Sequence, residues 1–394
     1  MSASVKRSAE VVVVGLGAHG AATLYQLAKR GVDVIGLDRF VPPHDRGSSH
    51  GGSRLTREAV GEGAAYVPLV RRANQIIAEL EAESGETLLV KSGMLIVGSP
   101  MTNAAALHGA KDFLATTLEV AARFQIPHEM LDAVALRRRF PQFLTFKDSD
   151  RGYFEPQSGY IRPEALIATQ LAAARKAGAT VRDNVIVTGI EQTAGGVTVH
   201  SSAGDFTAKR VVVAAGAWAR GLLGSPFDKL LTVTRQTLHW YEAESYEPFT
   251  PEKLPAFIWF VTDRLEDYFT AFAVTDPSEG IKMVASRDAP DIDPETAAPA
   301  TREEAEAFYD HNVGPNMAHV TRKVIKSGIC FYTNTPDGGF IIDNHPAMDK
   351  VLVVSACSGH GFKHSAAVGE AVAETLHDGA SRIDLSTFSL ARFA

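Results

Sequence analysis

The first part of the chain alternates between apolar and polar positions with two different periods. An apolar, β-branched run over residues 10–14 predicts a buried strand, and a glycine-rich turn then leads into the helical pattern AATLYQLAKRG, which ends at Gly31. A second apolar run over residues 32–37 predicts another strand. Strand, turn, helix and strand in this order form a βαβ unit, which is typical of a dinucleotide-binding fold.

Similar patterns return later in the chain. Pro163 stands at the start of an alanine-rich helical pattern that stops at Gly178. The strand patterns VIVTGIEQ, GVTVHSS and FTAKRVVVAAGAW then predict a small antiparallel meander ending in a buried strand, residues 210–215, which we expect to rejoin the opening sheet. The last segment, VLVVSACSGHGFKHSAAVGEAVAETLHDG, predicts a strand, a glycine-rich loop and a helix.

Two stretches, residues 86–154 and 226–324, are less regular and mix a strand pattern over residues 231–242 with a helix pattern over residues 302–311. They predict a discontinuous substrate domain with an antiparallel sheet. The predicted fold class is α/β, with α+β character in this second domain. The ranges expected for the dinucleotide-binding domain are 1–85, 155–225 and 325–394.

The composition is that of a globular protein, with 45% hydrophobic residues, 22% charged residues and a formal net charge of -7. Basic residues are scattered, so we expect a small-molecule partner and neither nucleic acid nor a membrane. Two cysteines, Cys330 and Cys357, are too few for a disulfide framework, and no metal is expected. No apolar segment is long enough for a signal peptide or a membrane span, so the expected location is cytoplasmic.

The glycine-rich turn carries the candidate dinucleotide site. Gly15 permits a tight turn, Gly17 lets the backbone approach a pyrophosphate, and Gly20 lets the helix pack against the strand. Asp38, at the end of the second strand, is placed to accept a hydrogen bond from a ribose hydroxyl. The alternative is a glycine-rich turn in an ordinary α/β sheet, but the strand, the helix and the acidic residue agree with the first interpretation.

This motif alone does not distinguish NAD from FAD. Later segments of the chain favour FAD. A second strand ends in Ala-Gly-Ala-Trp at residues 215–218, and a third glycine-rich loop precedes a helix near the C-terminus. The N-terminus of such a helix can stabilise a flavin ring that becomes anionic on reduction. A nicotinamide enzyme has no need of that third contact.

Three separated segments carry a resemblance to a known family. PPHDRGSSHGGSRLTREAVGEGAAYVPL, CFYTNTPDGGFIIDNHP and SGHGFKHS, in this order, resemble the monomeric sarcosine oxidase and N-methyltryptophan oxidase family, with a looser match over residues 240–320. The resemblance implies a monomeric flavoenzyme with a glutathione-reductase-like FAD-binding Rossmann domain. It also implies oxidation of a secondary amine, an N-methyl or cyclic amino acid, with oxygen as the electron acceptor and hydrogen peroxide as a product.

In that family the flavin is attached through its 8α-methyl group to a cysteine, and the matching residue is Cys330. For an arbitrary cysteine in a strand, a small buried hydrophobic residue is the better interpretation. The motif around Cys330 favours the covalent link instead, whereas Cys357 keeps the interpretation as a core residue. Tyr332 falls on the same strand face as Cys330, so it either lines the substrate site or belongs to the core.

The resemblance also implies roles for five basic residues. Arg57 and Lys363 match residues that clamp the substrate carboxylate, Arg54 and His50 match residues beside the flavin ring, and Lys282 matches a lysine that activates oxygen. An arginine fork suits a carboxylate, and a fixed ammonium stabilises the negative charge that develops on oxygen. The alternative for each of them is a solvated surface charge.

Two local features complete the candidate site. Arg54 and Arg57 are three residues apart, so they share a face if their segment is helical. In the loop Gly359-His360-Gly361, the glycines let the backbone pass the edge of the flavin. His360 either contacts the flavin in this loop, or it caps the following helix or packs in the interior.

The chain departs from the family at two places near the expected substrate. The sarcosine and methyltryptophan enzymes carry Arg-His-Ala-Tyr where this chain has Arg57-Glu58-Ala59-Val60, and a histidine where it has Ser286. These changes leave room for a larger side chain or a different amine, and Glu58 adds a negative charge if it points inward. The segments expected to cover the pocket also hold His239, Trp240, Trp259, Tyr268 and Phe269.

Three hypotheses follow from these patterns. The leading one is an FAD-dependent amine oxidase. The second is an FAD-dependent dehydrogenase that passes electrons to a quinone or a carrier protein, which loss of the Lys282 role would favour. The third is a flavin-binding protein without turnover, but placing Arg57, Lys282 and Lys363 together over a flavin is costly unless anions bind there.

Overall fold

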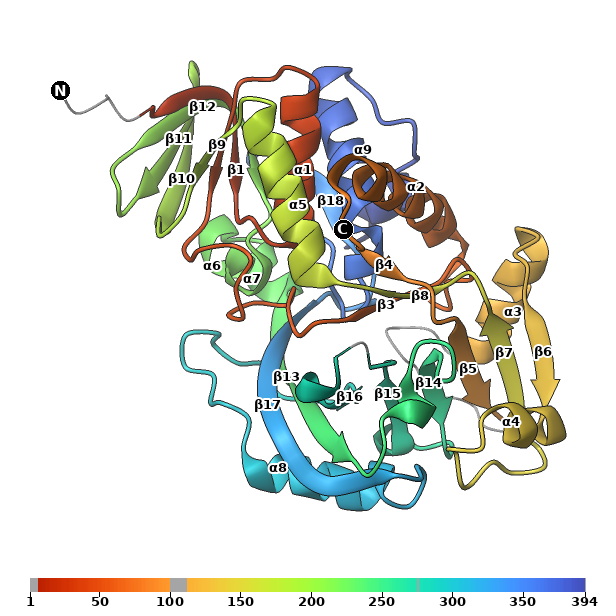
Figure 1. Cartoon of the computed structure of the whole chain (residues 1–394). Coiled ribbons are helices and arrows are strands. Elements are labelled where there is room, and N and C mark those ends of the chain that lie inside the picture. Colours follow the sequence, from red (N-terminus) through yellow and green to blue (C-terminus); the bar gives the residue numbers. More distant parts are fainter. Residues whose placement is uncertain (1–5, 100–111, 275, 394) are drawn as a thin grey trace.

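The computed structural model of the chain describes residues 6–99, 112–274 and 276–393. The strands form two large sheets, with a small three-stranded sheet between them (Figure 1). Helices cover the upper sheet in this view, and the lower sheet is curved. The chain crosses between the two large sheets several times, so each is built from distant parts of the sequence.

The upper sheet contains the predicted βαβ unit. β1 (Ser8–Val14) pairs in parallel with β2 (Val34–Leu37) on one side and with β12 (Phe206–Val213) on the other. β12 also pairs in parallel with β19 (Met348–Ser355). Both faces of such a sheet are buried, which explains the valine-rich run of β1. The other strands are β9 (Thr180–Arg182), β10 (Val187–Thr193), β11 (Gly196–Ser201) and β18 (Ile341–His345).

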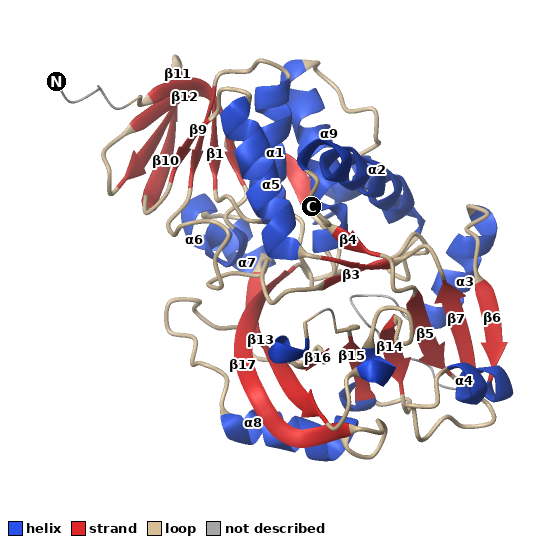
Figure 2. Ribbon diagram, viewed as in Figure 1, coloured by secondary structure: helices blue, strands red, loops and turns tan. Residues whose placement is uncertain are grey.

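Four helices cover one face of this sheet (Figure 2). α1 (Ala18–Lys29) packs against α5 (Pro163–Lys176) and α9 (Ser365–His377), and α2 (Val67–Ser84) packs against α9. α5 has a proline at its first position, where the missing N–H has no helical partner to lose. The apolar sides of these helices and of the sheet share one core.

The lower sheet is mixed rather than purely antiparallel. Across the sheet its strands are β17 (Val320–Asn334), β13 (Thr232–Ala243), β16 (Ile281–Val284), β15 (Tyr268–Ala271), β14 (Ala256–Phe260), β5 (Met94–Gly98), β7 (Arg151–Glu155) and β6 (Glu129–Asp132). All neighbours pair antiparallel except β14 and β5, which are parallel. The sequence predicted only antiparallel pairing, and the exception arises because these two strands are too distant in the chain for a hairpin to set their direction.

The small sheet lies between the two large ones. Its strands are β3 (Arg54–Thr56), β8 (Gly159–Ile161) and β4 (Leu89–Val90). Because Arg54 begins a strand, the helical arrangement considered for Arg54 and Arg57 is wrong. The remaining helices are α3 (Phe113–Arg123), α4 (Ala133–Arg139), α6 (Ala219–Leu223), α7 (Phe227–Leu230) and α8 (Arg302–Phe308).

Most of the predicted elements are present. The strand over residues 231–242 is β13, and the helix over residues 302–311 is α8 followed by a π-helical turn. The strands β10, β11 and β12 form the predicted antiparallel meander, and β12 rejoins the opening sheet. The domain boundaries remain a prediction. Within the described part of the chain, no helix has the length and apolar character needed to cross a membrane.

Candidate active site

A cavity of about 460 Å³ lies where the upper sheet, the lower sheet and the loop before α9 meet. It extends from the end of β2, past the glycine-rich turn, to β15, β16 and β17. All the residues predicted for the site line this cavity except Gly20 and His50. The fold therefore brings residues from distant parts of the sequence to one elongated space.

The glycine-rich turn forms one end of the cavity. A Cβ on Gly15 would lie 2.5 Å from the carbonyl oxygen of Ala214, and a Cβ on Gly20 would lie 1.7 Å from the carbonyl oxygen of Gly15. A Cβ on Gly17 would meet only the hydroxyl of Ser49, at 3.6 Å, and Gly17 faces the cavity. Gly15 and Gly20 thus serve the fold, whereas Gly17 leaves space for a bound group.

Asp38 lies beside this turn, at the end of β2, and is buried. Its two carboxylate oxygens accept hydrogen bonds from the backbone N–H groups of Leu16 (2.7 Å) and Phe40 (2.8 Å). The carboxylate also lines the cavity, so it is held where it could accept a hydrogen bond from a ribose hydroxyl.

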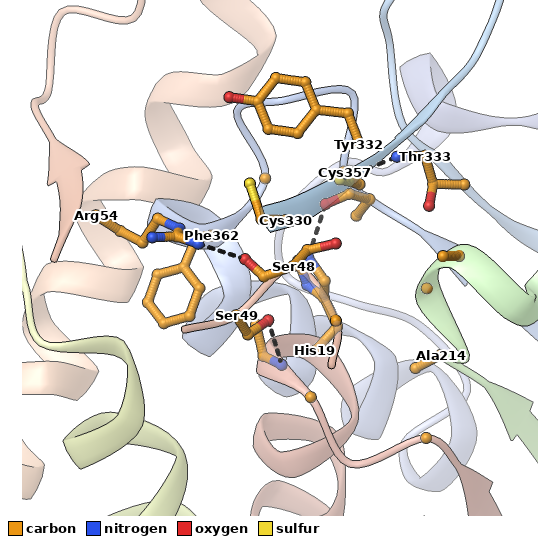
Figure 3. Close-up of a pocket in the computed structure, with 18 of the residues that line it drawn as sticks. His19, Ser48, Ser49, Arg54, Ala214, Cys330, Tyr332, Thr333, Cys357 and Phe362 are labelled. Carbon is orange, nitrogen blue, oxygen red and sulfur yellow. Dashed lines mark hydrogen bonds between the residues drawn. The ribbon is translucent and has the colours of Figure 1, made fainter. Parts of the chain in front are cut away.

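Cys330 and Tyr332 extend from β17 on the same face and line the far part of the cavity (Figure 3). Side chains two residues apart in a strand point the same way, as the sequence predicted. Burial raises the pKa of the Cys330 thiol, while Arg54 and Lys282 act in the opposite direction. Without a bound group, this thiol therefore stays protonated near neutral pH.

Cys357 differs from the sequence interpretation. It is only half-buried and lines the same cavity, so it is not a core residue. Its sulfur accepts a hydrogen bond from the backbone N–H of Thr333, at 3.5 Å (Figure 3). It lies near Cys330 because β17 and the loop after β19 are adjacent, which the sequence alone did not indicate.

Arg54 and Lys282 bring two basic side chains to the cavity. Arg54 donates to the carbonyl oxygen of Ser48 at 2.7 Å, and Lys282 donates to the carbonyl oxygen of Ser53 at 2.8 Å. The Lys282 ammonium also lies 4.7 Å from the centroid of the Phe272 ring. Burial, followed by the charge of Arg54, lowers the pKa of Lys282 well below its usual range.

His50 is the one predicted basic residue that the structure places behind the cavity wall. Its side chain is buried, and burial together with Arg54 and Lys282 lowers its pKa to about 4. Its imidazole is therefore neutral near pH 7. His50 is not among the residues that line the cavity, and its predicted place beside the flavin ring stays a prediction.

Arg57 and Lys363 lie on either side of an acidic residue that the sequence analysis missed, Glu62. Arg57 Nη2 is 2.8 Å from one oxygen of Glu62, and Lys363 Nζ is 3.6 Å from the other. The three side chains are 2% or 3% exposed. Burial, partly offset by Glu62, lowers the pKa of Lys363 to about 7. The signal in the sequence that could have revealed Glu62 was an acidic residue within a run of small and apolar residues, 59–65.

A group of hydroxyls from the lower sheet also lines the cavity. The hydroxyls of Ser286 and Tyr332 are 3.0 Å apart, and the backbone N–H of Ser286 donates to the Tyr268 hydroxyl at 2.6 Å. Thr270 lines the cavity one row further along the sheet. Ser286, which stands where the related enzymes have a histidine, is therefore part of a neutral, hydrogen-bonding wall.

The other departure from the family does not alter the cavity directly. Glu58 points away from it and binds Arg71 at 2.9 Å, and Val60 is buried in the core beneath the helices. The condition under which Glu58 would add a negative charge to the pocket, an inward-pointing side chain, is therefore not met.

The aromatic residues expected over the pocket divide between the two faces of the lower sheet. Tyr268 lines the cavity, and Trp240 packs against Cys330 without lining it. Trp259 and Phe269 face the opposite core, and His239 packs against Phe308. The alternation of side chains along β13, β14 and β15 separates the two sets.

Among the residues that the structure describes, no group of three or more histidine, cysteine or acidic side chains is arranged to hold a metal ion. The polar groups that line the cavity suit an anionic dinucleotide rather than a metal ion. A fixed carboxylate and an open glycine turn lie at one end, and four basic residues, Arg54, Arg57, Lys282 and Lys363, lie at the other. This arrangement defines a dinucleotide-dependent oxidoreductase whose reacting centre lies between a Rossmann-type sheet and a second sheet.

Comparison with known proteins identifies the family. Residues 10–375 match the family described as DAO, FAD dependent oxidoreductase. The chain belongs to this family, and its fold is the mixed α/β fold of that family, with a Rossmann-like FAD-binding sheet and a separate mixed sheet. It is an FAD-dependent oxidoreductase of the amine oxidase group.

Relatives are similar over nearly the whole chain. The chain is 35% identical to monomeric sarcosine oxidase from Streptomyces avermitilis, over 98% of each chain. It is 34% identical to N-methyl-L-tryptophan oxidase from Yersinia pestis, over 98% of this chain and 99% of the relative.

Solved structures share the fold at lower identity. NikD, an unusual amino acid oxidase essential for nikkomycin biosynthesis, superimposes with a TM-score of 0.81 at 23% identity, covering 98% of both chains. L-proline dehydrogenase from P. horikoshii superimposes with a TM-score of 0.80 at 18% identity, covering 99% of this chain and 98% of that chain.

The residues present fit FAD. Gly17 leaves the space that a pyrophosphate needs, and the fixed carboxylate of Asp38 suits the ribose hydroxyls of the adenosine half. At the other end, Arg54, Lys282 and Lys363 provide positive charge around the place where an isoalloxazine would lie. The cavity joins the two ends without interruption.

Proposed function

We propose that this protein catalyses the FAD-dependent oxidation of a secondary amine, an N-methyl or cyclic amino acid, to an imine, with oxygen as the acceptor and hydrogen peroxide as the product. The observation that carries this proposal is the position of Arg57 and Lys363, two buried cations that share a single carboxylate, Glu62. The names of the relatives, sarcosine oxidase and N-methyl-L-tryptophan oxidase, belong to the same substrate class.

The substrate carboxylate is proposed to bind Arg57 and Lys363. For both contacts to form, Glu62 has to release at least one of its partners, because the three side chains are buried together. This exchange of one carboxylate for another avoids leaving a buried cation unpaired. Fixing the carboxylate also fixes the α-carbon and the amine next to it.

FAD, when bound, supplies the redox chemistry by accepting a hydride equivalent from the amine and passing the electrons to oxygen. The basic residues around the cavity favour the neutral amine, because nearby positive charge lowers the pKa of an ammonium group. Lys282, with a pKa lowered by burial, can take up a proton where negative charge develops and so assist the reduction of oxygen.

Cys330 is proposed as the covalent anchor of the flavin. Its position supports this role, since its thiol lies in the cavity among Arg54, Lys282 and Tyr332. Arg54 and Lys282 favour the thiolate, the reactive form of cysteine, although burial has the larger effect and raises the pKa of this thiol.

The anchor is tested by precipitating the purified holoprotein with acid. We expect the yellow colour to stay with the precipitate of the wild type and to move to the supernatant for Cys330→Ser. Cys357→Ser is the matched control, because this thiol lines the same cavity, and its flavin is expected to remain in the precipitate. Free flavin in the wild-type supernatant would contradict the link.

The reaction is tested by measuring peroxide release with sarcosine, N-methyltryptophan, pipecolate, proline and N-methyl dicarboxylic amino acids. We expect at least one of these secondary amines to release peroxide in step with oxygen consumption. Reduction of an artificial dye without peroxide would replace the oxidase with a dehydrogenase. An FAD-loaded protein that reduces neither acceptor with any of these amines would overturn the proposed function.

A further inference from the structure

The segment between β16 and α8 connects the lower sheet to the adenosine end of the cavity. In Figure 1 it is the long cyan loop that precedes α8. It contains almost no regular secondary structure, but side chains of other elements hold it at three places. These three places show which part of the segment could open and which could not.

The first place fixes the beginning of the segment. One oxygen of Asp291 accepts a hydrogen bond from the backbone N–H of Val233 at 2.7 Å, and the other binds Arg220 of α6 at 2.5 Å. The backbone N–H of Ile292 donates to the carbonyl oxygen of Val233 at 2.8 Å. The segment is thereby attached to the start of β13 and to α6.

The second place fixes its end. Arg235 of β13 donates to the carbonyl oxygens of Ala298 (2.7 Å) and Pro299 (2.9 Å). The same guanidinium binds both oxygens of Glu304 in the first turn of α8, at 2.8 and 2.9 Å. One arginine therefore anchors the end of the segment to a regular element.

The third place is the tip, which reaches the upper sheet through Glu295. One oxygen of Glu295 binds both Arg39, at 2.5 Å, and the indole N–H of Trp218, at 2.8 Å. The Arg39 guanidinium lies over the rings of Trp218 (4.7 Å to the centroid) and Phe40 (5.1 Å). Glu295, Arg39, Phe40 and Trp218 all line the cavity.

These residues lie at the adenosine end, as the order of groups in FAD requires. The flavin end belongs beside Cys330, the pyrophosphate at the turn of Gly17, and the ribose at Asp38. Arg39 and Phe40 follow Asp38 directly in the chain, and so they line the space beyond the ribose, where the adenine belongs.

We propose that residues 288–301 form a latch over the adenosine half of FAD, with Glu295 as the positioning residue that holds Arg39 and Trp218 against it. The two planar groups offer stacking surfaces for a purine, and the carboxylate keeps them in place. Because both ends of the segment are anchored elsewhere, loss of the Glu295 contacts releases only the tip. A segment attached to the lower sheet thus helps to hold the part of FAD that binds to the upper sheet.

The latch is tested by measuring the dissociation constants of FAD and FMN with the Cys330→Ser protein, from which the flavin is removed and then titrated back by fluorescence. We expect Glu295→Gln in this background to weaken FAD binding about tenfold, as loss of a charge-assisted contact does. FMN lacks the adenosine half, so its affinity should not change. Glu303→Gln, an exposed residue in α8, is the control and should leave both affinities unchanged.

A second readout keeps the proposal open to contradiction. Asp293 is exposed beside Glu295 in the tip and provides a cleavage site for endoproteinase Asp-N. We expect FAD to slow cleavage there in the Cys330→Ser protein and FMN to have less effect. Equal weakening of FAD and FMN by Glu295→Gln would mean a structural role only, and an unchanged FAD affinity would overturn the latch.

Discussion

At the scale of single residues, burial makes the charge of the ionic cluster depend on its neighbours. Lys363 is almost fully buried and its pKa falls to about 7, so near neutral pH it is close to losing its proton. Glu62 and Arg57 then determine the net charge that an incoming carboxylate meets. A site of this kind binds anions best when Lys363 is protonated.

The affinity of a carboxylate for the FAD-loaded enzyme should therefore fall as the pH rises above about 7, the pKa of Lys363. Bound carboxylate favours the protonated lysine, so the dissociation constant rises from that pH until the pKa of the complex is passed. N-acetylglycine is a suitable probe because it has no amine that titrates, and the flavin absorbance reports its binding.

Two variants separate this effect from other titrations. Lys363→Met should bind N-acetylglycine weakly at all pH values and lose the dependence around pH 7. Lys209→Met, at an exposed lysine on the outer part of β12, should behave as the wild type. A pH dependence that persists in Lys363→Met would assign it to another group.

At the scale of elements, the glycine-rich turn uses its glycines for two separate purposes. Gly20 gives α1 its close contact with the turn, since a Cβ there would lie 1.7 Å from a backbone oxygen. Gly17 has φ -70, which any residue adopts, and open space in front of it. The fold therefore needs a glycine at position 20, whereas at position 17 only the bound ligand needs one.

Alanine at these two positions should have opposite effects. We expect Gly20→Ala to lower the free energy of unfolding of the FAD-free protein by about 3 kcal/mol or more, because backbone atoms have to move. Gly17→Ala should leave this free energy nearly unchanged but weaken FAD binding, because its methyl group occupies the space of the pyrophosphate. Denaturant unfolding and FAD titration measure the two effects. Equal destabilisation by both substitutions would contradict this division.

At the scale of the whole molecule, the cavity is lined by both large sheets, so one ligand contacts two bodies of the protein. Lys363 is paired with Glu62, but Arg54 lowers the pKa of Lys282, so these two basic groups repel one another and cost free energy in the absence of FAD. A bound dinucleotide supplies negative phosphate groups and fills the space between the sheets. FAD should therefore stabilise the entire fold, not only the turn that holds its phosphates.

The melting temperature of the Cys330→Ser protein should rise with FAD concentration. Mass action gives about 2.7 kcal/mol of added stability at an FAD concentration 100 times the dissociation constant. Differential scanning calorimetry with increasing FAD measures the shift, and ADP, which cannot bridge the sheets to Cys330, should produce a smaller one. A melting temperature independent of FAD would contradict the bridging role.

The sequence by itself determined the features that depend on neighbours along the chain. The spacing of Gly15, Gly17 and Gly20 before a helix, and of Asp38 after the next strand, predicted the Rossmann-type unit because such a turn is local. The alternation along β17 likewise predicted that Cys330 and Tyr332 share a face. The resemblance to the family rested on three short, separated segments that occur along the chain in the same order as in the family.

Only the tertiary structure decided the contacts between distant segments. It placed Glu62 between Arg57 and Lys363, put His50 behind the wall, turned Glu58 away from the cavity, and brought Glu295 to Arg39. These positions depend on how two sheets and their connecting loops pack, and a charged residue in a loop carries no local periodicity that fixes its direction. The same packing made β14 and β5 parallel, because strands far apart in the chain pair as the core requires.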